Sequence, residues 1–175
     1  MANVSRSLTA LTYVIWPLAF LIAASPFVFF WLPPDFAFAK HDLLNDYGGV
    51  EHLLIWQKIL GFFVTYLPAA FLLWALSYLY RLVGALKSGE WFEEYSEILC
   101  HRFGRTLLWY VGVEIVHRTL LVLVLTGANP PGQKQLYLSF SNNDLMALVP
   151  AILALIFAHI VSLGRAQREE LKQII

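Results

Sequence analysis

The chain has 175 residues, of which 59% are hydrophobic, 15% aromatic and 14% charged, and its formal net charge is zero. Soluble domains carry about 25% charged residues, so this composition, with a mean hydropathy of +0.63, excludes a water-soluble fold. A neutral chain lacks the basic surface that displaces counterions from phosphates, which excludes direct nucleic-acid binding. The single cysteine, Cys100, permits no internal disulfide.

Four apolar segments are each long enough to cross a lipid bilayer as a helix. They are residues 8–32, 59–80, 106–126 and 145–164. A helix rises about 1.5 Å per residue, so roughly 20 residues cover a hydrocarbon core about 30 Å thick. We therefore predict a single transmembrane domain, residues 1–175, with the all-α fold of an integral membrane four-helix bundle.

The segment between the first two spans contains residue types that can bind divalent metals, namely His41, Asp42, Asp46, Glu51 and His52. They form no recognised ligand motif, and segments outside membranes are commonly rich in such residues, so we expect no metal site. The sequence also has no Gly-x-Ser-x-Gly elbow, no His-Glu-x-x-His motif and no glycine-rich phosphate loop. We therefore expect no catalytic residues, no cofactor and no enzymatic activity.

Lysine and arginine concentrate on one side of the predicted spans. Because positively charged loops are retained in the cytoplasm, this distribution predicts that both termini are cytoplasmic. Eight of the twelve basic residues lie near the amino terminus, in the segment 81–105 or in the carboxyl-terminal tail: Arg6, Arg81, Lys87, Arg102, Arg105, Arg165, Arg168 and Lys172.

The segment 81–105, between the second and third spans, has helical periodicity. From Trp91 onward, apolar residues recur on one face and charged residues on the other, which predicts an amphipathic cytoplasmic helical extension before the third span. This extension either anchors the bundle at the membrane surface or forms a docking surface for another protein. As a docking surface it would offer two apolar anchors and an acidic rim. These are Trp91 and Phe92, then Glu93, Glu94 and Glu97.

The third span contains charged residues near its middle, Glu114, His117 and Arg118. A charge at the centre of a membrane helix opposes insertion by roughly 2.5 to 3.5 kcal/mol, so these residues need partners. The spacing of Glu114 and Arg118 places them on one helix face, where they can pair, and His117 lies beside them. From the distances of Glu114 and His159 to the cytoplasmic ends of their spans, we predict that His159 faces Glu114 inside the bundle.

Two interpretations of this cluster stay open. It is a buried polar staple that fixes the register of the helices, as polar side chains in membranes often do. Alternatively, it is a proton or ion relay, because ionisable residues inside transporters mark substrate paths. A relay usually needs a ladder of titratable groups across the whole membrane, and the first and second spans contribute no charged residue.

Several motifs carry a resemblance to a known family. They are Leu79-Tyr80-Arg81-Leu82, Leu86-Lys87-Ser88-Gly89-Glu90-Trp91-Phe92 and Ser139-Phe140-Ser141-Asn142-Asn143-Asp144-Leu145. With these motifs the chain resembles, over roughly residues 8–175, the small bacterial membrane proteins grouped as domain of unknown function 2975. Where such relatives tend to be arginine-rich after the phenylalanine, this chain has Cys100, His101 and Arg102.

The resemblance implies a four-span protein of the bacterial inner membrane without an assigned activity, and it supplies no catalytic residues. Members are often encoded beside small helix-turn-helix regulators, which implies such a regulatory protein as a cytoplasmic partner. We therefore expect a non-enzymatic regulatory or structural membrane component that acts through segment 81–105 on such a protein or by self-association. The alternative is a small transporter or ion- or proton-conducting subunit that uses Glu114, His117, Arg118 and His159.

Overall fold

The structure is a computed structural model that describes residues 2–32, 53–89, 91, 93–129 and 142–174. Within these residues the chain forms four helices: α1 (Ala2–Trp31), α3 (Ile55–Lys87), α4 (Glu94–Thr126) and α5 (Asn142–Ile174). Each of them is long and apolar enough to cross a membrane. For the described residues, the predicted all-α fold with four helices capable of spanning a membrane is therefore confirmed. The residues considered for a metal site, in the range 41–52, lie outside the described residues.

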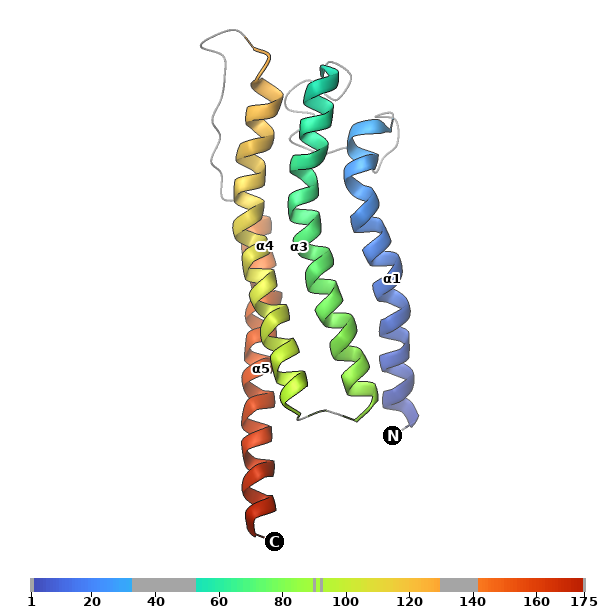
Figure 1. Cartoon of the computed structure of the whole chain (residues 1–175), viewed down its shortest axis with the longest axis vertical. Helices are drawn as coiled ribbons and strands as arrows, with labels where there is room; N and C mark the ends of the chain where they lie inside the picture. The colour runs from blue at the N-terminus through green and yellow to red at the C-terminus, as the bar shows by residue number, and fades with distance from the viewer. Residues whose placement is uncertain (1, 33–52, 90, 92, 130–141, 175) are drawn as a thin grey trace.

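The helices run alternately in opposite directions, and each packs mainly against its neighbour along the chain (Figure 1). Helices α1, α3 and α4 stand side by side, and α5 lies against α4 (Figure 1). Both ends of the chain lie at the same end of the bundle (Figure 1). We call this the termini end, and it also carries the turn between α3 and α4.

The packed interior is small, and much of the apolar surface faces outward. In the described part of the chain, three groups of buried side chains join the helices: Phe30 with Leu121 and Leu125, Leu8 with Ile15 and Val83, and Ala75 with Leu107 and Ala151. Large apolar side chains are exposed on every helix, for example Trp16, Phe63, Trp109 and Phe157. Soluble monomers rarely expose so much contiguous apolar surface, whereas lipid covers it at no cost. The outer surface thus agrees with a multi-pass membrane protein.

One glutamine side chain connects the start of α3 with the end of α4. The amide nitrogen of Gln57 donates to the carbonyl oxygens of Val124 (2.9 Å) and Leu125 (3.0 Å), and its side-chain oxygen accepts from the backbone N–H of Leu54 (3.0 Å). Carbonyls in the last turn of a helix have no partner within the helix. Gln57 therefore satisfies groups at two helix ends with a single buried side chain.

Helix α3 continues beyond the predicted span and ends at Lys87. The backbone N–H of Ser88 donates to the carbonyl oxygen of Gly84, and Gly89 has a φ of +90°. This left-handed conformation favours glycine and is a common way to end a helix. Helix α4 then begins at Glu94 and runs without a break into the third predicted span.

Helix α5 is displaced along α4 relative to the sequence-based alignment of the spans. If residues 106–126 and 145–164 lay at one depth, residue 106 would face residue 164. In the structure a Cβ atom placed on Gly104 would lie 2.9 Å from the side chain of Leu155. The displacement of about ten residues corresponds to roughly 15 Å along the helix axis. Helix α5 accordingly begins beside the middle of α4 and extends past it at the termini end (Figure 1).

The contact at Gly104 yields a stability test. We expect Gly104→Ala to lower the free energy of unfolding by about 1 to 3 kcal/mol, because the added methyl group forces Leu155 and the α5 backbone away from α4. The matched control is Gly112→Ala on the same helix, where a Cβ atom meets nothing within 4 Å. That change should raise stability by about 0.5 to 1 kcal/mol through helix propensity. Unfolding in detergent micelles, followed by circular dichroism, measures both, and equal effects would contradict the packing.

Candidate functional site

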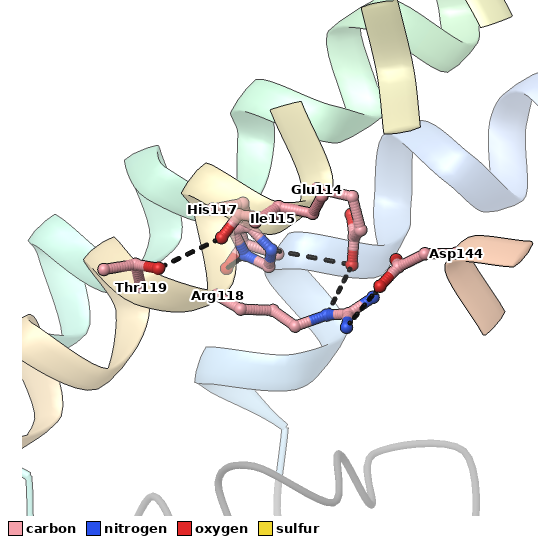
Figure 2. Close-up of polar contacts among 7 residues, drawn as sticks. Glu114, Ile115, His117, Arg118, Thr119 and Asp144 are labelled. Atoms are coloured by element: carbon pink, nitrogen blue, oxygen red, sulfur yellow. Dashed lines mark hydrogen bonds and ion pairs between the residues drawn. The ribbon is translucent and has the colours of Figure 1, made fainter. Parts of the chain in front are cut away.

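The centre of the candidate site is an ion pair between α4 and α5. The guanidinium of Arg118 donates through Nη1 to Oδ2 of Asp144 at 3.0 Å and through Nη2 to Oδ1 of the same carboxylate (Figure 2). The Arg118 side chain is 11% exposed and that of Asp144 is 1% exposed. A bidentate ion pair of this kind fixes both the distance and the orientation between the two side chains, whereas a single charge contact fixes only the distance.

Glu114 adds a second carboxylate to the same guanidinium. Its Oε1 lies 3.6 Å from Nε of Arg118 and 3.7 Å from Nδ1 of His117 (Figure 2). The pairing of Glu114 with Arg118, four residues apart on one helix face, is confirmed. His117 also lies beside Glu114, as predicted, although 3.7 Å is too long for a hydrogen bond.

His117 extends the cluster to α3. Its side chain is buried, and Nε2 lies 3.4 Å from the hydroxyl oxygen of Thr65. Polar groups therefore follow one another from α3 through α4 to α5, in the order Thr65, His117, Glu114, Arg118 and Asp144.

This polar row runs across the bundle, not along it. Its α4 members span only four residues, or about 6 Å of helix axis, against a hydrocarbon core about 30 Å thick. Thr65 and Asp144 extend it sideways to the neighbouring helices. Such an arrangement can hold three helices at one register, because each helix supplies a group that another helix needs.

The prediction that His159 faces Glu114 is wrong. His159 is exposed, and it follows Asp144 by 15 residues, or about 22 Å along α5. The prediction assumed that the apolar spans of α4 and α5 lie at equal depth. Because α5 is displaced along α4, Asp144 and not His159 meets the charged part of α4.

The predicted docking residues lie at the termini end, partly in contact with α5. Trp91 is 42% exposed, and Phe92 lies outside the described residues. Each of the three acidic rim residues pairs with an arginine of α5, and Arg165 forms one further pair within α5. The pairs are Arg165 with Glu94 (3.5 Å), Glu97 (3.4 Å) and Glu169 (2.9 Å), and Arg168 with Glu93 (3.5 Å).

Neither Asp144 nor Arg165 belongs to the candidate site predicted from the sequence, where Arg165 serves only to predict the orientation of the chain. A signal for both is present in the charge spacing. Glu97 and Arg118 are 21 residues apart on α4, and Asp144 and Arg165 are 21 residues apart on α5. In an antiparallel pair of helices, equal spacing lets both opposite-charge pairs form in one register, and the structure has both.

Among the described residues, no three histidine, cysteine or acidic side chains gather closely enough to hold a metal ion. Comparisons with known proteins add no assignment: no protein-family model, curated protein or solved structure matches this chain. The resemblance to the family of domain of unknown function 2975 stays a prediction.

The pair of Arg118 and Asp144 can be tested by a double-mutant cycle. We expect Asp144→Ala to cost about 3 kcal/mol of unfolding free energy, because it leaves the buried Arg118 charge without its main partner. The double variant Arg118→Met with Asp144→Leu should recover most of this loss, since it removes both charges together.

The control for this cycle is Glu93→Gln, which breaks an exposed pair with Arg168. Exposed pairs contribute little, so its effect should be much smaller than that of Asp144→Ala. Unfolding of all variants in the same detergent gives the coupling free energy. Strictly additive effects of the two single substitutions at positions 118 and 144 would argue against the pair as the staple.

Proposed function

We propose that the chain is a multi-pass protein of the bacterial inner membrane with both termini in the cytoplasm. The side assignment follows from the concentration of lysine and arginine at the termini end. The choice of membrane follows from the resemblance to the bacterial family of domain of unknown function 2975. In this orientation the turn between α3 and α4 and the last turns of α5 face the cytoplasm.

We further propose that the protein acts as a non-enzymatic regulatory or structural component, and that a partner docks at the turn between α3 and α4. The observation that carries this proposal is the exposure of Trp91 in that turn. Large aromatic residues supply most of the binding energy at many protein interfaces. The partner is a cytoplasmic regulatory protein, of the helix-turn-helix type by family resemblance, or a second copy of the chain.

The charged residues around Trp91 suit such an interface. Glu93 and Glu94, both more than half exposed, and the exposed Arg168 surround the turn with charges of both signs. Exposed pairs exchange partners at little cost because they contribute little stability. A partner with complementary charges can thus replace the ion pairs to α5 while it covers Trp91. Binding of the partner would then free the carboxyl-terminal end of α5 from these pairs.

The polar cluster around Arg118 supports a structural role in this proposal. Arg118 contacts two carboxylates, and His117 is placed between Glu114 and Thr65. The row joins α3, α4 and α5 sideways, whereas a proton relay needs groups that follow one another along the membrane normal. We therefore assign the cluster the role of a staple.

A proton-conducting subunit is the second candidate, and one observation favours it. His117 is a buried titratable side chain whose Nδ1 has no hydrogen-bond partner among the described residues, and it lies beside the carboxylate of Glu114. Buried ionisable residues of this kind occur in proton-coupled transporters. The two candidates differ in what they predict for Glu114.

Photo-cross-linking in native membranes tests the docking proposal. A photo-reactive residue at position 91 should give a discrete protein adduct, because the partner covers this side chain. The matched control is position 56, where Trp56 is 44% exposed at the opposite end of the bundle, against 42% for Trp91. Adducts at both positions, or only lipid adducts at position 91, would contradict the proposal.

Proton flux separates the staple from the relay. We expect proteoliposomes with the wild-type chain to take up protons no faster than protein-free vesicles, and Glu114→Gln to lower stability without changing flux, because it weakens the contacts to Arg118 and His117. The control is Glu94→Gln, at an exposed carboxylate. A wild-type flux that disappears in a folded Glu114→Gln variant would establish the relay instead.

A further inference from the structure

A groove of about 410 Å³ opens between α3 and α4 on the outer surface of the bundle. Helix α3 contributes three aromatic side chains to it, and α4 contributes two arginines and a tryptophan. These residues are Phe71, Trp74 and Tyr78 on α3, and Arg102, Arg105 and Trp109 on α4. None of them belongs to the polar cluster around Arg118 or to the turn that carries Trp91.

The aromatic side of the groove is a continuous ladder. The ring centroids of Phe71 and Trp74 are 6.1 Å apart, and those of Trp74 and Tyr78 are 6.2 Å apart, with the second pair stacked. Their spacing of three and four residues places all three rings on one face of α3. Trp74 is 54% exposed, so the ladder presents an apolar strip to whatever lies beside the bundle.

The arginine side of the groove has positive charge without counter-charge. Arg102 and Arg105 are both exposed, and in the described part of the chain neither forms an ion pair with a carboxylate. Arg118, Arg165 and Arg168, in contrast, each contact an acidic side chain. Two adjacent guanidinium groups of this kind can donate several hydrogen bonds to one anion.

The groove lies where the apolar stretches of α3 and α4 end, at the expected boundary between the hydrocarbon core and the head-group layer. Arg105 immediately precedes the apolar stretch 106–126, and Tyr78 lies near the end of the apolar stretch 59–80. The arginines thus lie where hydrocarbon gives way to the head-group layer, and Trp74 and Phe71 lie deeper. Tryptophan and tyrosine prefer this boundary as well.

We propose that this groove is a specific binding site for an anionic phospholipid in the leaflet at the termini end. Arg102 and Arg105 hold the phosphate of the head group, and one acyl chain lies along the aromatic ladder of α3 and against Trp109. Basic pockets between membrane helices commonly select acidic lipids in this manner. The unbalanced double positive charge selects an anionic over a zwitterionic lipid, because a zwitterionic head group brings its own cation.

A second groove provides an internal comparison. It lies between α1 and α3, has a volume of about 380 Å³ and is lined by Trp16, Tyr80 and Arg81 among mainly apolar residues. It is similar in size but has one arginine instead of two. The proposal therefore expects charge selection in the α3–α4 groove and little selection in the α1–α3 groove.

Native mass spectrometry of the detergent-solubilised full chain tests the proposal. Phosphatidylglycerol and phosphatidylcholine with identical acyl chains serve as probes. We expect the affinity for the first phosphatidylglycerol to be at least about fivefold higher than the affinity for phosphatidylcholine. The double variant Arg102→Gln with Arg105→Gln should abolish this preference. The matched control is Arg6→Gln with Arg81→Gln, which removes the same charge at exposed positions outside the groove and should keep the preference.

Further measurements distinguish binding of a lipid from binding of free phosphate, and loss of the binding site from loss of the fold. Millimolar inorganic phosphate should not displace the bound phosphatidylglycerol, and Trp109→Ala should weaken its retention with both arginines intact. Circular dichroism of each variant should match the wild type, since the substituted side chains are exposed. Equal binding of the two lipids, unchanged selectivity in the Arg102 and Arg105 variant, or displacement by phosphate alone would overturn the proposal.

Discussion

A guanidinium group in an apolar surrounding must be paired, and this constraint determines how the carboxyl-terminal half of the chain folds. Arg118 lies within the apolar part of α4, and its partners are Glu114 on the same helix and Asp144 on α5. Lipid offers no substitute for either carboxylate. The register in which Arg118 pairs with Asp144 also brings Glu97 close to Arg165. An ion pair therefore forms near each end of the α4–α5 interface.

The sequence predicts what depends on neighbouring residues and misses what depends on the register between helices. Four spans follow from apolar length, and the pairing of Glu114 with Arg118 follows from a spacing of four residues. The position of α5 was inferred from equal depth of the apolar stretches, which misplaced His159 and overlooked Asp144. Apolar contacts vary little as one helix slides along another, whereas a pair of charges has a single best register.

The structural and the proposed binding roles lie in different parts of the molecule. The polar row of Thr65, His117, Glu114, Arg118 and Asp144 joins α3, α4 and α5 inside the bundle. Trp91 lies exposed at the termini end, as do Arg102 and Arg105, which form no ion pair with any carboxylate that the structure describes. A rigid interior supports exposed groups of this kind at defined positions, since residues on stable helices are held more precisely than residues on loops.

The displacement of α5 has a consequence for the surrounding membrane. The apolar stretches 145–164 on α5 and 106–126 on α4 are offset by roughly 15 Å, about half the thickness of a hydrocarbon core. A flat bilayer of uniform thickness cannot match both stretches, and each ångström of mismatch costs a fraction of a kcal/mol. Either the lipid layer deforms beside α5, or the whole bundle tilts so that the hydrophobic mismatch is divided between α4 and α5. The energy of the folded chain therefore depends on the thickness and bending stiffness of the membrane that holds it.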